Sequence, residues 1–224
     1  MNRRLARLAT AVTVLGIVAC GRSVQPIVQG GMPAVGPRTP SEQAAADSGR
    51  MPYTRADVDF MQGMIGHHAQ AVEMAAWAAT NGARHDVRIL AARIDVSQRD
   101  EIAFMQRWLR ERHEMVPDAN GRHQMNGHDM AGMTMMPGML TPAQMAQLSV
   151  ASGPEFDRLF LTFMIQHHQG AITMVETLFG STGAGQDLYI FRFASDVNAD
   201  QATEIERMQS MLSSAPLHHL DAAK

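Results

Sequence analysis

Several features that would point directly to a function are scarce or absent in this chain. Cysteine occurs once, at Cys20, so no disulfide can form within the chain. Lysine and arginine (19) nearly balance aspartate and glutamate (22), and the net charge of −3 lacks the basic footprint of a nucleic-acid-binding protein. No Gly-x-Ser-x-Gly elbow occurs, and nucleophilic catalysis has little support. We therefore expect a protein that is not an enzyme and has no nucleic-acid partner.

The apolar run near the N-terminus is too short to span a bilayer comfortably. It extends from Leu8 to Ala19 after three arginines, and this layout predicts a secretory signal peptide over residues 1–19. The run ends in Ile-Val-Ala-Cys, which resembles a bacterial lipobox and predicts lipidation of Cys20. An ordinary signal peptide with an incidental cysteine is the alternative. We expect an exported protein of the cell envelope, lipid-anchored in the periplasm or on the outer face of a membrane.

Composition divides the remaining chain into three parts. Residues 20–52 are rich in Gly, Pro, Ser, Ala and Gln without a sustained apolar period, which is typical of a disordered tether. Residues 53–214 are long enough for one folded domain. Residues 215–224 are expected to form a flexible tail.

One segment of the sequence occurs twice. Residues 64–74, MIGHHAQAVEM, match residues 164–174, MIQHHQGAITM. The similarity extends over two repeats, 55–113 and 154–213, and the later part of each repeat carries a Gln-x-x-Glu segment. A repeat of this length with two segments predicts paired helical hairpins and not a solenoid.

Apolar residues recur with a helical period in each of these segments. The pattern and the turn residues predict long helices near 55–80, 86–113, 154–181 and 185–213, and a short helix near 142–150. Two amphipathic hairpins can bury four apolar stripes in a four-helix bundle. The predicted fold class is all-α, with two repeated hairpins joined by a long Met- and His-rich connection over 114–141.

Both copies of the repeated block place thioethers and imidazoles on apolar helix faces. Thioether sulfur favours Cu(I), and imidazole binds copper in either oxidation state. Core methionines and structural histidines are the ordinary alternatives. Adjacent histidines project about 100° apart on a helix, so one of each pair can be a surface or supporting residue. The candidate copper ligands of the bundle are Met64, His67, His68, Met74, Met164, His167, His168 and Met174.

The connection between the hairpins is a second candidate metal-binding segment. Residues 113–139 contain seven methionines and three histidines, and Gly and Pro interrupt every candidate helix. Because a core helix cannot explain these methionines, we expect the loop to bind metal, with an oxidation-prone flexible linker as the alternative. Its candidate ligands are His128, Met130, Met133, Met135, Met136 and Met139.

Gln98 and Gln201 occupy equivalent positions inside the apolar arcs of the second segments. Leaving a buried amide without a partner costs about 1–3 kcal/mol. One hypothesis is that both glutamines orient ligand histidines. A bond to the backbone or to another polar side chain is the alternative. Glu101 and Glu204 lie at the edges of the arcs, where we expect solvent-exposed roles.

These motifs resemble the DUF305 family. The resemblance rests on Met-Ile-x-His-His-x-x-Ala-x-x-Met, on the Gln-x-x-Glu segments and on the connecting MPGMLTPAQM sequence, and it spans about 53–213. It implies a ferritin-like four-helix bundle that is secreted or membrane-anchored. Family members with an assigned role are linked to copper binding and copper resistance outside the cytoplasm.

Three classes of function remain. The first is a copper-binding protein that buffers, sequesters or transfers Cu(I), with Cu(II) or Ag(I) as alternatives, and delivers it to a partner protein. The second is a ferritin-like oxidase, but the Glu-x-x-His motif of such centres is absent from the chain. The third is a metal-free envelope interaction protein in which the histidine pairs are structural.

Overall fold

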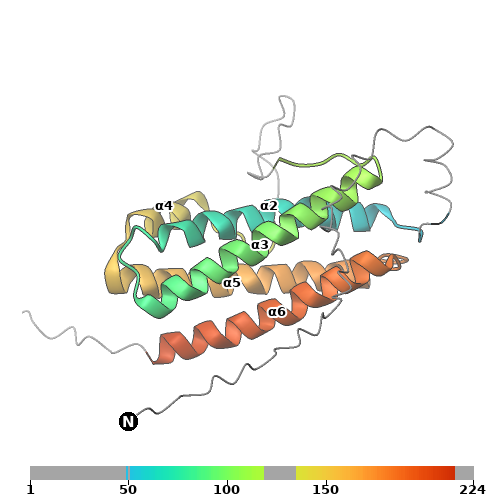
Figure 1. Cartoon of the computed structure of the whole chain (residues 1–224). Coiled ribbons are helices and arrows are strands. Elements are labelled where there is room, and N and C mark those ends of the chain that lie inside the picture. The colour runs from blue at the N-terminus through green and yellow to red at the C-terminus, as the bar shows by residue number, and fades with distance from the viewer. Residues whose placement is uncertain (1–48, 50, 119–134, 215–224) are drawn as a thin grey trace, which may run out of the picture. The chain divides into compact units, whose positions relative to one another are not determined.

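The computed structural model describes residue 49 and residues 51–118 and 135–214, and within these ranges all regular secondary structure is α-helical (Figure 1). The elements are α2 (Arg55–Trp77), α3 (His85–Glu111), α4 (Pro142–Val150), α5 (Gly153–Gly180) and α6 (Leu188–Ser213). Each predicted helix is present, with ends that differ from the prediction by three residues or fewer. The predicted leader, most of the tether, the tail and part of the connection lie outside the described residues. So do Cys20, His128, Met130 and Met133.

Local side chains start three of the helices. Thr54 and Asp57 form a capping box at the start of α2, and Thr141 and Gln144 form one at the start of α4. The Asp187 side chain accepts backbone N–H groups in the first turn of α6. Such caps satisfy N–H groups that a helix leaves without partners.

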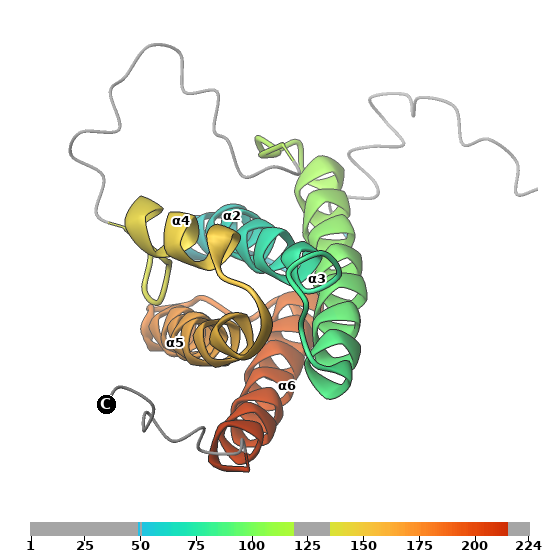
Figure 2. The ribbon, with the colours of Figure 1, turned by 90° about the vertical axis from the view of Figure 1, so that its left-hand side faces the viewer.

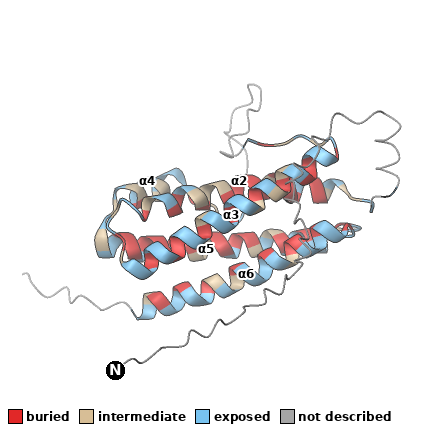
Figure 3. Ribbon diagram, in the orientation of Figure 1, coloured by how far each residue is buried: buried red, intermediate tan, exposed pale blue. Residues whose placement is uncertain are grey.

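The four long helices form two hairpins, α2/α3 and α5/α6, that meet along α2 and α5. Figure 2 shows them end-on, with α4 beside α2 and α5. Buried residues follow the inward faces of the helices, as Figure 3 shows. Among the described residues, no helix has the length and apolar character needed to cross a membrane.

The apolar core consists of two clusters. One includes Ala71–Ile94, Phe156–Met164 and Ile205–Met211, and the other includes Val58–Ile65, Ile102–Leu109 and Ala171–Val197. Between these stretches, each of the four long helices carries polar residues that are buried or half-buried: His67, His68, Gln98, Glu101, His167, His168, Gln201 and Glu204. A polar layer thus divides the core at the middle of the bundle.

A pair of repeat-equivalent aspartates joins the two hairpins. Asp57, at the start of α2, accepts a hydrogen bond of 2.7 Å from the backbone N–H of Gly185 in the α5–α6 turn. Asp157, at the start of α5, accepts one of 3.1 Å from the backbone N–H of Arg84 before α3. Because each aspartate holds the turn of the other hairpin, α2 and α5 are antiparallel and the two histidine pairs meet at the same depth.

Candidate metal centre

The four histidines of the repeated blocks lie in the polar middle layer. His67 and His68 are on α2, and His167 and His168 are on α5. All four are 0% exposed. The expectation that one histidine of each pair could be a surface residue is therefore wrong, because the α3 and α6 hairpin partners cover the second direction in which each pair projects.

The imidazole rings form one contiguous cluster. The ring centroids of His67 and His167, which come from opposite repeats, are 3.9 Å apart. The centroid separation is 6.4 Å between His67 and His68, and 6.2 Å between His167 and His168. These contacts unite both pairs in a single cluster.

A carboxylate holds one histidine of each pair. The Nε2 atom of His68 is 2.5 Å from Oε2 of Glu101 on α3. The Nε2 atom of His168 is 2.7 Å from Oε2 of Glu204 on α6. The two glutamate side chains are 20% and 24% exposed, whereas the imidazoles are fully buried. These carboxylates therefore connect the buried cluster with the surface.

The other two histidines bond to backbone carbonyls. Nε2 of His67 lies 3.0 Å from the carbonyl oxygen of Pro137 in the connecting segment. Nε2 of His167 lies 3.0 Å from the carbonyl oxygen of His67. A carbonyl oxygen can only accept, so both Nε2 atoms must carry the hydrogen. The bonds thereby fix the tautomer of both rings.

Burial keeps these two rings neutral. Loss of solvation and then repulsion from His68 lower the pKa of His67 to about 3, against the opposing effect of its bond to Pro137. Loss of solvation and then repulsion from His67 hold the pKa of His167 well below its ordinary value. A neutral ring that carries its hydrogen on Nε2 has a lone pair on Nδ1, and that lone pair is the form that binds a metal.

The Nδ1 atom is buried and without a hydrogen-bond partner in all four described rings. Metal-ligating histidines ordinarily donate the other ring N–H to a carboxylate or a backbone carbonyl, which is the arrangement seen at each Nε2 here. The donor set therefore fits a metal that accepts neutral imidazole. Within the described residues, no group of three or more His, Cys, Asp or Glu side chains is arranged to hold an ion. Binding at this cluster thus requires thioether ligands or a shift of the rings.

Methionines adjoin the cluster on both sides. Met64 and Met164 are fully buried, one helical turn before His68 and His168. The Sδ atom of Met136 and the terminal methyl of Met174 both lie over Gly63, 3.3 Å from the position that a Cβ there would take.

Gly63 precedes His67 by one turn of α2. The structure thus brings a thioether of the connection and one of α5 to the histidine layer.

A sequence profile described as "Domain of unknown function (DUF305)" matches residues 57–212, which cover both hairpins and the histidine layer. The chain belongs to the DUF305 family. No curated protein matches it.

Solved structures share the fold of this DUF305 protein. A DUF305 fragment from Deinococcus radiodurans is 29% identical with a TM-score of 0.60, and the match covers 73% of this chain and 99% of that one. A DUF305 protein from Streptomyces coelicolor, predicted to be secreted, is 28% identical with a TM-score of 0.59 over 70% and 91% of the two chains. The Cu(II)-bound form of CopM is 28% identical with a TM-score of 0.55 over 70% and 95%.

The other predicted ligands lie at different distances from the histidine layer. Met74 is fully buried two turns after His67, whereas Met135 is 47% exposed and Met139 is half-buried in the connection. The end of the connection is fixed to the bundle: Gln70 bonds to both backbone groups of Leu140.

The predicted bonds from Gln98 and Gln201 to the histidines are not present in the described structure. Both amide atoms of Gln98 and the Oε1 atom of Gln201 are buried without a hydrogen-bond partner. The carboxylate three residues further along each helix makes the bond to histidine instead. The expectation of solvent-exposed roles for Glu101 and Glu204 is therefore wrong. Their recurrence at equivalent places in both repeats was the signal that could have identified them.

Proposed function

We propose that this DUF305 protein is a non-enzymatic copper-binding protein that buffers, sequesters or hands over Cu(I) outside the cytoplasm. The observation that carries the proposal is the set of four buried histidines whose Nε2 atoms are bonded to oxygen and whose Nδ1 atoms have no hydrogen-bond partner in the described structure. Lone pairs left unmatched in a protein interior destabilise the metal-free state and favour an occupant that accepts them.

The neighbouring side chains favour a soft ion. Met64 and Met164 lie one turn before His68 and His168, and Met136 and Met174 lie over Gly63, one turn before His67. Thioether and imidazole together match Cu(I), while the imidazoles also accept Cu(II). Glu101 and Glu204 would fix the rings of His68 and His168 and raise the basicity of their ligating nitrogens. The bound form of CopM, a structure of the same fold, is in accord with copper as the ion.

The N-terminal sequence supports a location in the cell envelope. Residues 1–19 have the layout of a signal peptide, and Cys20 is placed for lipidation. A lipid on Cys20 would anchor the bundle to a membrane surface, with the tether 21–52 as the spacer. The similar protein from Streptomyces coelicolor, predicted to be secreted, agrees with export.

An anaerobic titration of residues 21–224 with Cu(I) against a chromogenic chelator tests the function. The informative variant is Met64→Leu/Met164→Leu, which removes two sulfurs while nearly conserving core volume. We expect the wild type to take copper from the chelator and this variant to bind it about tenfold more weakly or worse.

The matched control is Met105→Leu/Met208→Leu. These residues are also repeat-equivalent and 0% exposed, but they lie on α3 and α6. Equal affinities of the two double variants would remove Met64 and Met164 from the site. A wild type that cannot compete even with a weak chelator would refute copper binding, and the histidine layer would then be structural.

A further inference from the structure

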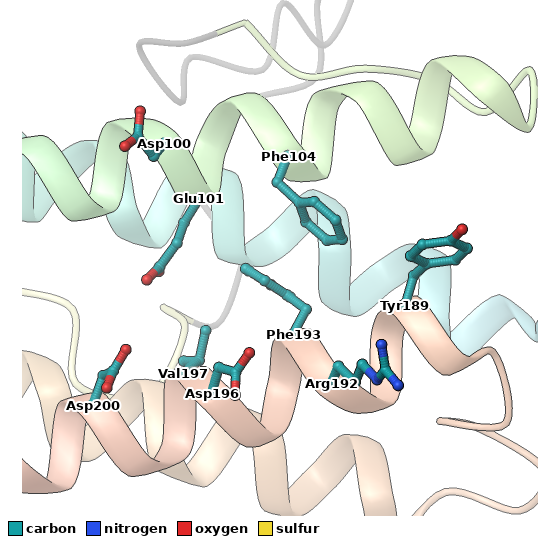
Figure 4. A pocket seen from close by; sticks show the side chains of 9 residues that line it. All are labelled: Asp100, Glu101, Phe104, Tyr189, Arg192, Phe193, Asp196, Val197 and Asp200. Atoms are coloured by element: carbon teal, nitrogen blue, oxygen red, sulfur yellow. The ribbon is translucent and has the colours of Figure 1, made fainter.

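Two adjacent hollows form a groove between α3 and α6. The larger has a volume of about 430 Å³ and is lined by Asp100 of α3 and by Asp196 and Asp200 of α6, and Figure 4 shows the two α6 side chains pointing toward α3. Glu101 projects from α3 into the same space. Phe104 and Phe193 stack at its floor with ring centroids 5.0 Å apart. The groove is thus apolar at its base and acidic along its rims.

The smaller hollow, of about 190 Å³, lies next to the first and shares Glu101 and Asp200 with it. Its walls include Gln98 and Glu101 from α3 and Gln201 and Glu204 from α6. The two Gln-x-x-Glu segments of the repeats therefore face each other across this space. Behind them lie His68 and His168, each bonded to one of the two glutamates.

The glutamine side chains of this hollow have amide atoms that lack hydrogen-bond partners in the described part of the protein. Gln98 is 2% exposed and Gln201 is 3% exposed. Both amide atoms of Gln98 and the Oε1 atom of Gln201 are without a hydrogen-bond partner in the described structure. Buried amides are rarely left in this state, so each one needs an explanation. Carbonyl oxygens that line a hollow and accept nothing from the protein are suited to a cation or its hydration shell.

More acidic than basic side chains line the groove, and this excess of negative charge favours a cation. Five carboxylates line the two hollows, from Asp100, Glu101, Asp196, Asp200 and Glu204. The guanidinium groups that line them are those of Arg93 and Arg192. Loss of solvation, followed by repulsion from Glu101 and Glu204, raises the pKa of Asp200, in agreement with a concentrated negative field.

We propose that the groove between α3 and α6 is the uptake site for the metal ion, where carboxylate and amide oxygens capture a hydrated cation before it passes to the histidine layer. This inference rests on the proposed function. Oxygen ligands hold a soft ion weakly compared with imidazole and thioether, so a captured ion moves inward. Glu101 and Glu204 form the boundary, because each is partly exposed to the groove and bonded to a fully buried histidine.

The test is the second-order rate constant of Cu(I) uptake from a weak chromogenic chelator, measured where the rate rises with protein concentration. The groove variant is Asp100→Asn/Asp196→Asn/Asp200→Asn, which leaves the glutamate–histidine bonds in place. Its control is Glu73→Gln/Glu176→Gln/Glu206→Gln, which changes the net charge equally at exposed positions that line neither hollow.

We expect uptake by the groove variant to be about fivefold slower than by the control at low salt, with a smaller difference in about 0.5 M salt. A second variant, Gln98→Leu/Gln201→Leu, should also slow uptake while its thermal midpoint stays level or rises.

Equal rates for the groove variant and the control would overturn the uptake site while the wild type still binds copper. A wild type that takes up no copper would overturn both the uptake site and the proposed function.

Discussion

In each of the four buried histidine rings, Nε2 takes part in a hydrogen bond and Nδ1 has no hydrogen-bond partner in the described structure. An unsatisfied buried polar atom costs about 1–3 kcal/mol. The four Nδ1 atoms and the glutamine amides therefore lower the free energy of unfolding of the bundle substantially. The apolar clusters on both sides of the layer must offset that cost. Sites that destabilise the fold in this way are commonly functional ones.

The bond between His68 and Glu101 predicts a graded effect of substitution. Glu101→Leu removes the acceptor of Nε2 and should weaken copper binding about 10–100-fold, because the tautomer and orientation of the ring are no longer fixed. Glu101→Gln keeps an acceptor oxygen and should weaken it less. Chelator competition with both variants measures the difference. An equal loss in both would show that the negative charge matters and the hydrogen bond does not.

The neutral state of His67 predicts a dependence of stability on pH. Its pKa is about 3 in the folded protein and about 6.5 when the chain is unfolded. Between these values the unfolded state binds a proton that the folded state does not, so the free energy of unfolding decreases as the pH falls below about 6.5. The contribution of His67 at about pH 5 is a loss of about 2 kcal/mol.

Urea unfolding of the metal-free protein at about pH 7 and pH 5 measures this loss. In His67→Asn the decrease over the same interval should be smaller. If the variant and the wild type lose the same free energy, His67 does not determine the acid sensitivity.

Sequence patterns identify the candidate ligand residues better than the residues that hold those side chains in place. His67 and His167 stand out because a duplicated His-His block in an apolar arc is unusual, and the structure buries both. The recurrence of Glu101 and Glu204 marks them as a pair, but it does not give their role, because a glutamate at the edge of an amphipathic helix has the same pattern whether it meets solvent or a histidine. Only the contact between α2 and α3 distinguishes the two, and helical periodicity does not specify that contact.

The positions of the helices could be predicted from the local sequence, because the apolar period, the capping residues and the turn residues indicate the same helix in each case. The connection is different: its Gly and Pro residues exclude a helix but do not say where the chain runs. Gly138 has a φ of +73°, and a Cβ added there would lie 2.6 Å from the carbonyl oxygen of Gln166 on α5. Close backbone packing of this kind depends on tertiary contact and leaves no periodic signal.

The packing of the connection against α5 predicts an effect of Gly170→Ala. A Cβ on Gly170 would overlap the carbonyl group of Pro137, which is the acceptor for His67. Although alanine favours a helix, displacement of a backbone segment should make the variant less stable by about 2 kcal/mol. Copper affinity should fall as well, because Met136 and the acceptor of His67 move together.

The control is Gly180→Ala at the end of α5. A Cβ there has nothing within 4 Å, so stability should change by about 0.5 kcal/mol or less. Denaturant unfolding compares the two variants, and a stable Gly170→Ala protein with unchanged copper binding would contradict the close packing.

At the scale of the whole molecule, the two repeats are joined by reciprocal bonds. Asp57 and Asp157 lie at the same distance before the two histidine blocks, so the repeat identifies them as equivalent residues. Their partners, Gly185 and Arg84, are backbone groups of the opposite hairpin and have no sequence signature. The bundle could therefore be predicted from amphipathic patterns, whereas its antiparallel α2–α5 arrangement could not.

These bonds predict that Asp57→Asn and Asp157→Asn each lower stability by about 1–2 kcal/mol, because the backbone N–H of a buried or half-buried residue loses a charged acceptor. Asp57→Asn should cost more, since Asp57 also completes the cap of α2. The bonds are at opposite ends of the central helix pair, so the losses should add in the double variant. Asp59→Asn, at an exposed position of α2, is the control for thermal unfolding. Losses that fail to add would mean that the two turns are coupled.

The bond from His167 to the carbonyl of His67 has no reciprocal partner, because His67 bonds to Pro137 of the connection instead. The two repeats therefore differ at the place where their histidines come closest together, because the equivalent rings of His67 and His167 have different hydrogen-bond partners. Successive metal equivalents at this layer would meet inequivalent rings and load in order. In a spectrum that resolves imidazole nitrogens, His67 and His167 would give distinct signals even before any ion is added.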